Sequence, residues 1–171
     1  MAEVIVLRLV HILGGMFWVG TALFTSVFLL PALGEGGGAR QAVLAGLQRR
    51  RLFAVMPLVA IFTILSGARL MWITSGGFAG SYFASAMGLT YGVSGALAVL
   101  SFVLGIIIVR PTGVRMGAIG ADLARATDDS RRAALSAEMG KLQRRNERAS
   151  LVVVLLVVLA GAGMAVARYL V

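Results

Sequence analysis

Four long apolar runs constrain this chain more than any other feature of its sequence. A helix needs about 20 mainly apolar residues to cross the hydrocarbon core of a bilayer, which is about 30 Å thick. Only 13% of the 171 residues are charged, against about 25% in soluble domains, so most of the surface must face lipid. We expect a single all-α domain, an integral membrane four-helix bundle. The predicted spans cover residues 4–30, 52–74, 84–109 and 150–171.

Three prolines mark positions where these helices are expected to change. Proline has no N–H to donate to the helix ladder, so Pro31 is expected to end the first span and Pro111 the third. Pro57 falls in the first turns of the second span, where its missing N–H matters least. There we expect at most a mild kink.

The basic residues lie mostly in two of the three links, and this predicts the direction of the bundle. The second link, residues 75–84, carries no charge. The positive-inside rule therefore places both termini outside and the two basic links in the cytoplasm. The expected location is a bacterial inner membrane. The net charge of +9 is explained by this topology rather than by nucleic-acid binding. The basic residues are Arg40, Arg49, Arg50 and Arg51 in the first link, and Arg110, Arg115, Arg125, Arg131, Arg132, Lys141, Arg144, Arg145 and Arg148 in the third.

The third link, residues 110–149, is expected to fold as a helical hairpin. Apolar residues recur with helical spacing in its first half. The run Asp128-Asp129-Ser130 is typical of a helix N-cap, and nothing after it breaks the helix before the fourth span. We therefore expect span four to extend into the cytoplasm and to pack against residues 112–127. The alternative is an amphipathic stretch lying on anionic lipid.

The first span carries an unusual polar stripe. Arg8, His11 and Trp18 share one helical face, and His11 is the only histidine of the chain. Polar side chains in spans usually face the bundle interior or a watery cavity, and glycine lets a neighbouring backbone approach closely. We therefore expect this face to pack inward. The small residues on or beside it are Gly14, Gly15, Gly20, Ala22 and Thr25.

Other spans place further candidates toward the same outer end. With both termini outside, Arg69 and Arg168 reach the same outer quarter of the membrane as Arg8. This excess of cations over Glu3 and the terminal carboxylate predicts an anionic group that the sequence itself lacks. Snorkelling arginines, an interfacial aromatic belt and a hydrogen-bonded structural histidine form the alternative explanation. The candidate ligand-binding residues are Arg8, His11, Trp18, Arg69, Trp72, Tyr91, Ser94 and Arg168, with His11 also a candidate metal ligand.

Short motifs carry a resemblance to known membrane families. The pattern His11-Ile-Leu-Gly-Gly-Met-Phe-Trp-Val-Gly20, followed by Phe28-Leu-Leu-Pro31, resembles the first helix of copper-resistance-D-type bacterial proteins. It is also similar to small uncharacterised four-helix families and to protoporphyrinogen oxidases of the HemJ type. Thr63-Ile-Leu-Ser-Gly67 and Met164-Ala-Val-Ala-Arg-Tyr-Leu170 are similar to the uncharacterised group.

The resemblance implies that His11 handles haem b or copper. Without a second histidine, haem iron would need a methionine, an open position or the His11 of a second subunit as its other axial partner. A copper path would depend on methionines around His11. The candidate methionines are Met16, Met71 and Met87.

Three functions follow from these observations. The first is a non-enzymatic accessory subunit or ligand-binding bundle, whose outer cationic pocket around His11 holds a haem propionate, a lipid headgroup or a quinone oxygen. The second is a membrane oxidoreductase with haem b on His11, and the third is a copper-permeating protein. No acid except Glu3 lies outside the basic links, which argues against hydrolysis and carboxylate-based proton transport. The expected partners are the lipid bilayer and a homodimer or larger membrane complex, not nucleic acid.

Overall fold

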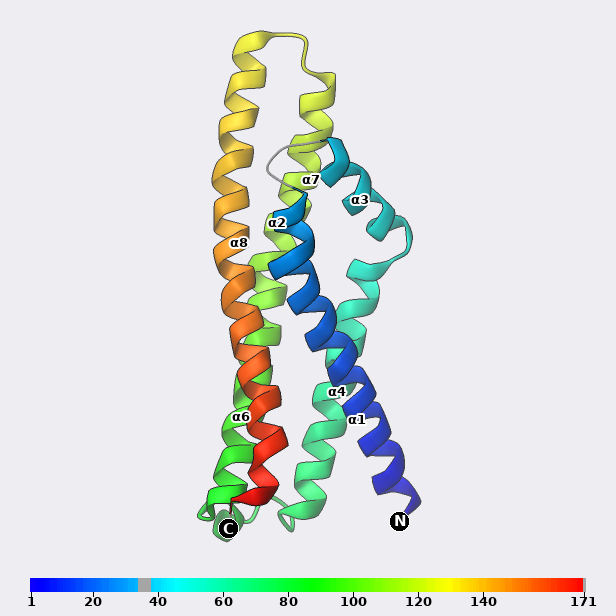
Figure 1. The fold of residues 1–171 in the computed structure, drawn as a ribbon, viewed down its shortest axis with the longest axis vertical. Coiled ribbons are helices and arrows are strands. Elements are labelled where there is room, and N and C mark those ends of the chain that lie inside the picture. The colour runs from blue at the N-terminus through cyan, green and yellow to red at the C-terminus, as the bar shows by residue number, and fades with distance from the viewer. Residues whose placement is uncertain (34–37, 171) are drawn as a thin grey trace.

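The computed structural model describes residues 1–33 and 38–170, in which every regular element is helical. Two pairs of long helices form the bundle: α1 packs along α4, and α6 packs along α8. Figure 1 shows both termini at one end, the terminal end, and a hairpin of α7 and α8 at the other, the hairpin end. The all-α four-helix architecture with its hairpin extension is confirmed. The elements are α1 (Ala2–Leu23), η1 (Phe24–Leu29), α2 (Leu30–Ala32), α3 (Gly38–Arg49), α4 (Leu52–Thr74), α5 (Gly80–Phe83), α6 (Ala86–Leu104), η2 (Gly105–Val109), α7 (Arg110–Arg125), α8 (Asp129–Val166) and η3 (Ala167–Tyr169).

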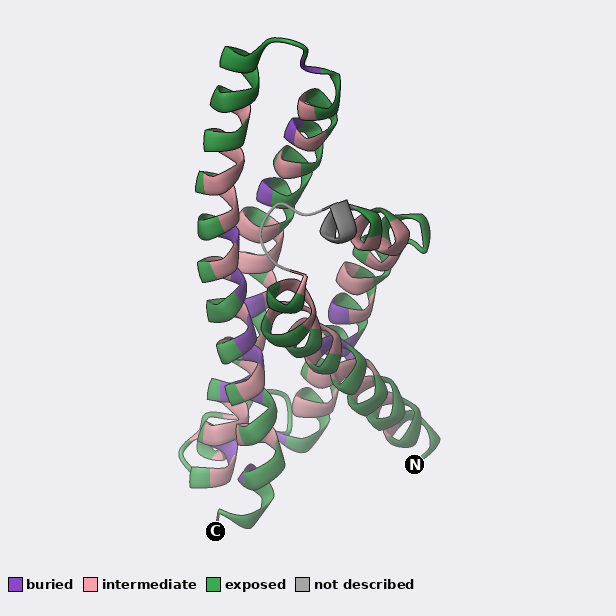
Figure 2. Cartoon of the chain, turned by 45° about the horizontal axis from the view of Figure 1, so that its top comes forward, coloured by how far each residue is buried: buried purple, intermediate pink, exposed green. Residues whose placement is uncertain are grey.

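The outer sides of the long helices are apolar and uncovered. Four helical stretches are long and apolar enough to cross a membrane. Figure 2 shows that their outward sides are exposed, while buried positions follow the sides that face one another. Leu13, Phe62 and Leu155 are among the exposed large side chains. So much contiguous apolar surface is costly in water and is satisfied in lipid. The chain is a multi-pass membrane protein.

The prediction that Pro111 closes the third helix is wrong. The helix continues from α6 through η2 and α7 to Arg125. The π-helical segment η2 ends two residues before Pro111, and the Arg110 N–H pairs with the Gly105 carbonyl, five residues back. The π-helical segment η1 likewise ends two residues before Pro31. After Pro31 the helix runs only as far as Ala32. A π turn is wider than an α turn, so it accommodates the proline ring and its missing donor.

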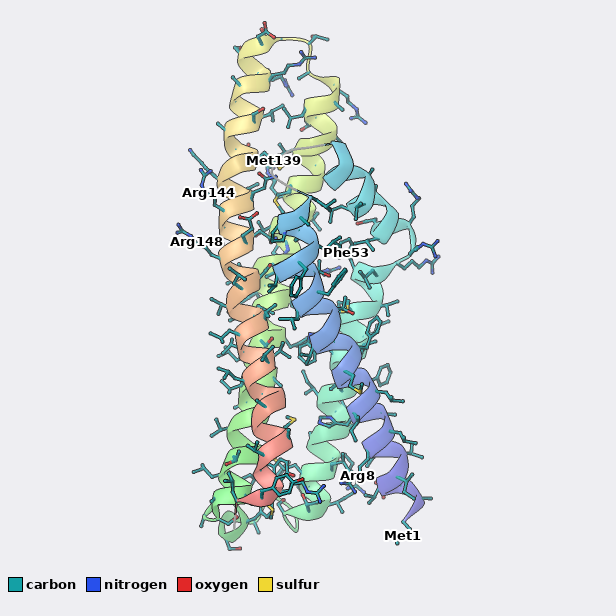
Figure 3. All side chains as sticks on the ribbon, in the orientation of Figure 1. Met1, Arg8, Phe53, Met139, Arg144 and Arg148 are labelled. Carbon is teal, nitrogen blue, oxygen red and sulfur yellow. The ribbon has the colours of Figure 1, made fainter. Side chains whose placement is uncertain are left out.

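The α7–α8 hairpin forms as the sequence predicts. Asp128 caps α8 by accepting a hydrogen bond from the Arg131 backbone N–H at 2.8 Å. The Ser130 hydroxyl, and after it this N–H, lower the pKa of the Asp128 carboxyl. The helices α7 and α8 contact each other, Ile119 of α7 is buried, and Figure 3 shows Met139 of α8 on the side toward α7. The two helices thus cover one another's apolar stripes. The side chain of Arg40 lies outside the described residues.

The small core lies where the four long helices meet. Trp18 of α1 is only 6% exposed and packs with Ala60 of α4 and Val157 of α8. Phe102 of α6 contacts the indole edge-on, with the two ring centroids 6.4 Å apart. The inward direction predicted for this part of the α1 stripe is therefore correct. Because Trp18 of α1 packs against residues of α4, α6 and α8, it joins the two helix pairs.

The uncharged link between α4 and α6 consists of a tight turn at residues 76–78 and the short helix α5. Gly76, Gly77 and Phe78 have positive φ values of 65°, 86° and 62°. Ser85 caps α6 by accepting from the Gly88 N–H at 3.1 Å. Gly88 is buried, and a Cβ on it would lie within 2.7 Å of the Tyr82 carbonyl carbon and closer still to its oxygen. The link can therefore close over α6 only because residue 88 has no side chain.

Candidate functional site

The imidazole of His11 bridges α1 and α4 at the terminal half of the bundle. Its Nδ1 lies 2.8 Å from the backbone carbonyl oxygen of Thr63. A carbonyl oxygen only accepts hydrogen bonds, so Nδ1 carries the proton and donates it. In the neutral ring the lone pair is then on Nε2. No hydrogen bond to Nε2 comes from the described residues, so this atom is available to accept a hydrogen bond or to bind a metal.

Small residues of both helices make room for this bridge. A Cβ on Gly67 would lie 2.6 Å from His11 Cε1 and 2.9 Å from Nδ1, so the ring packs directly on the α4 backbone. One turn deeper, Gly14 faces the Thr63 hydroxyl in the same way. Gly15 makes only an ordinary contact with Thr63, and Gly20 has no neighbour within 4 Å of its Cβ position. The close approach expected of all three glycines is therefore correct only for Gly14.

The hydroxyls that border the imidazole are satisfied within α4. The buried Thr63 hydroxyl donates to the Val59 carbonyl at 2.8 Å. The buried Ser66 hydroxyl lies 2.7 Å from the Phe62 carbonyl and 3.0 Å from that of Thr63. The Thr63 carbonyl is thus shared by Ser66 and His11. Because both hydroxyls already donate their protons within α4, neither has a proton left to donate to a ligand.

An ion pair lies toward the terminal end from the imidazole. Arg69 of α4 donates from Nε to a Glu3 carboxylate oxygen at 2.8 Å, with both side chains about half exposed. Arg8 precedes His11 by one turn, is exposed, and lies near the terminal end of α1 in Figure 3. Glu3 therefore balances the charge of Arg69, whereas Arg8 belongs to no ion pair found among the described residues.

The remaining candidates lie elsewhere in the bundle. Trp72 of α4 is 47% exposed and packs edge-on against Phe78 of the link, with centroids 5.2 Å apart. Ser94 of α6 is buried against Gly163 of α8. The guanidinium of Arg168 lies 5.1 Å from the centre of the neighbouring Tyr169 ring. Tyr91 is half-buried on α6. The structure thus divides the predicted set between the α1–α4 pair and the α6–α8 pair.

The residues present suit one metal-binding imidazole and not a cage of protein ligands. Among the described residues no three His, Cys, Asp or Glu side chains come together. Met16 is exposed on α1, and the Met71 methyl group lies near Gly95 of α6. These positions lend no support to a methionine path around His11. A group that brings its own ligands, such as haem, needs from the chain only the donor that His11 offers.

Thr63 and Gly67 are the positions of the candidate site that sequence reasoning missed. They entered it only as part of a motif resemblance, although their i, i+4 spacing puts a carbonyl and a gap on one face of α4. A small residue on that face was the available signal, but nothing in the sequence pairs it with His11.

Comparisons of the chain with models of protein families, with curated proteins and with solved structures find no match. The resemblance to copper-resistance-D-type and HemJ-type proteins therefore stays a prediction. The geometry of the α1–α4 contact is the basis for assigning a function.

Proposed function

We propose that this chain is a non-enzymatic ligand-binding protein of the membrane, acting alone or as an accessory subunit, and that His11 binds the ligand through Nε2. The observation that carries the proposal is the 2.8 Å hydrogen bond from His11 Nδ1 to the Thr63 carbonyl. It fixes the tautomer and the plane of the ring before any ligand arrives. A side chain so oriented loses little further freedom on binding.

The protonation of the ring selects the class of ligand. An Nε2 lone pair accepts a hydrogen bond from a hydroxyl, as in a quinol, or coordinates a metal. It repels a quinone carbonyl or a phosphate oxygen, which would require a donor in the same place. The anionic or oxygen-rich edge of the ligand is expected toward the terminal end. Arg8 lies there, about 4.5 Å along the helix from His11.

Haem b is the second candidate, and the same hydrogen bond favours it. Metal-binding histidines usually donate their other ring N–H to a carbonyl or carboxylate, which orients the ring and raises its basicity. Here the Thr63 carbonyl would orient the ring, His11 Nε2 would hold the iron, and Arg8 would pair with a propionate. Haem would supply one-electron transfer.

Ligand content of the purified protein tests this proposal. We expect protein isolated in mild detergent to retain a small molecule, seen as a Soret band for haem or by mass spectrometry of an organic extract for a quinol. His11→Gln should lower the bound amount at least tenfold. Its amide N–H can still donate to the Thr63 carbonyl, but its oxygen is a poor iron ligand and a weaker acceptor than imidazole.

Thr90→Val is the matched control, because the Thr90 hydroxyl donates only to the Ala86 carbonyl of its own helix. It should keep the full ligand content. Equal content in wild type and His11→Gln, or none in protein from its native host, would refute the proposed function. A fall in thermal stability without a change in ligand content would assign His11 a packing role alone.

We further propose that both termini face the periplasm and that the α7–α8 hairpin lies in the cytoplasm, as the distribution of arginines indicates. The chain has no cysteine, so single cysteines report position directly. A membrane-impermeant thiol reagent should label Ser81→Cys in intact spheroplasts. It should label Ala45→Cys only after the membrane is opened. The reverse pattern would invert the topology.

A further inference from the structure

A cluster of four cations lies on one side of α8, where the hairpin meets the apolar part of the helix. Lys141, Arg144, Arg145 and Arg148 follow the three- and four-residue spacing of one helical face. Together they line a hollow of about 330 Å³. Figure 3 shows Arg144 and Arg148 projecting outward from α8, away from the other helices. The cluster therefore faces the surroundings of the bundle.

None of the four cations belongs to an ion pair found among the described residues. The ion pairs found there join Arg69 to Glu3 and Arg115 to Glu138. Arg144, Arg145 and Arg148 are exposed. Like charges at i, i+4 spacing repel each other. An external anion would relieve this repulsion and would meet guanidinium groups suited to bidentate binding of phosphate.

An uncovered apolar stripe continues from the cluster along α8. Leu151, Leu155 and Leu159 follow Arg144 and Arg148 at helical spacing, and each is about half exposed. The 20 residues from Glu147 to the end of α8 at Val166 span about 30 Å, the thickness of the hydrocarbon core. The headgroup layer extends about 5–7 Å further. The cation cluster is thus at the depth of phospholipid phosphates.

We propose that this face of α8 is a specific binding site for one anionic phospholipid. Its phosphate occupies the hollow among Arg144, Arg145 and Arg148, and one acyl chain lies along the leucine stripe. A soluble anion would use only the hollow. The direct continuation of the charged hollow into exposed leucines matches a molecule that is anionic at one end and apolar at the other. The site is at the opposite end of the bundle from His11, so it does not depend on the proposed function.

Native mass spectrometry of the full chain in detergent, titrated with phosphatidylglycerol, tests the proposal. Wild type should bind a first lipid in preference to later ones. Arg144→Gln/Arg148→Gln should bind this first lipid at least about tenfold more weakly, because two cations near the headgroup are lost. Both side chains are exposed, so the substitutions leave the core intact. Far-UV circular dichroism should show unchanged helix content.

Arg125→Gln/Arg131→Gln is the matched control, because it removes the same charge near the tip of the hairpin, more than a Debye length from the headgroup layer. It should bind phosphatidylglycerol as wild type does. Arg144→Lys/Arg148→Lys should bind the lipid more weakly than wild type but more tightly than the glutamine pair, because lysine keeps the charge and loses the bidentate geometry. Phosphatidylcholine should not distinguish wild type from Arg144→Gln/Arg148→Gln. If both glutamine pairs weakened phosphatidylglycerol binding equally, diffuse charge attraction would explain the binding without a specific site. If excess inorganic phosphate displaced the lipid, the hollow would be assigned to a soluble anion. Either result would overturn the proposal.

Discussion

Gly88→Ala is expected to destabilise the protein by about 3 kcal/mol, the largest effect expected from a methyl group at the glycines whose neighbours the structure describes. The new Cβ would overlap the backbone carbonyl of Tyr82, and the Tyr82 Cδ1 atom would lie only 2.8 Å away. Backbone cannot move aside as a side-chain end can, so overpacking here is at the upper end of the usual range. The Ser85 cap on the Gly88 N–H would be lost with the turn.

Denaturant titration of the detergent-solubilised protein, followed by far-UV circular dichroism, measures this effect. Gly105→Ala is the control in the same continuous helix, since nothing lies within 4 Å of its Cβ position. It should be neutral or stabilising by up to about 1 kcal/mol, because alanine is the better helix former. Equal stability of the two variants would show that the link does not close over α6 at residue 88.

Gly67→Ala is expected to displace the His11 ring and to cost about 1–3 kcal/mol of stability. Its Cβ would lie 2.6 Å from His11 Cε1, so α1 must move away from α4 or the imidazole must rotate. Either change lengthens the bond from Nδ1 to the Thr63 carbonyl, which is 2.8 Å in the native chain. The tautomer is then no longer fixed. Ligand content should therefore fall along with stability.

Gly161→Ala is the control for this variant, because it adds the same methyl group to a spanning helix at a position with no neighbour within 4 Å. It should leave both readouts unchanged. Absorption or mass spectrometry of an organic extract measures the ligand content. The denaturant titration measures the free energy of unfolding. Full ligand content with wild-type stability in Gly67→Ala would contradict the packing of His11 on α4.

The four membrane-spanning helices and the α7–α8 hairpin were predictable because they depend on local properties of the sequence. An apolar run that matches the bilayer thickness has few alternatives to a helix, since lipid offers its backbone no hydrogen bonds. The cap at Asp128 forms with residues no further along the chain than Arg131. Pro111 was misjudged for the opposite reason. Its effect depends on whether the preceding turn can widen, and proline rules assume a regular α turn.

The candidate site was only partly predictable. The inward face of α1 follows from the stripe that carries His11 and Trp18, and the structure buries Trp18 accordingly. The partner of the imidazole does not follow from sequence, because Thr63 contributes a backbone carbonyl that every residue possesses. The sequence also did not predict which partners the arginines have. Equal depth in the membrane did not reveal that Arg69 pairs with Glu3 while Arg168 stacks on Tyr169.

Sequence alone determined that this chain forms four apolar helices joined by two basic links and one uncharged link, because helix formation and transfer into lipid depend on the residues of each run taken separately. Tertiary structure decided the tautomer of His11 and its packing against α4. The proton on Nδ1, the lone pair on Nε2 and the missing Cβ beneath the ring all depend on which turn of α4 lies against which turn of α1. That register is a property of two helices packed together, and neither run contains it.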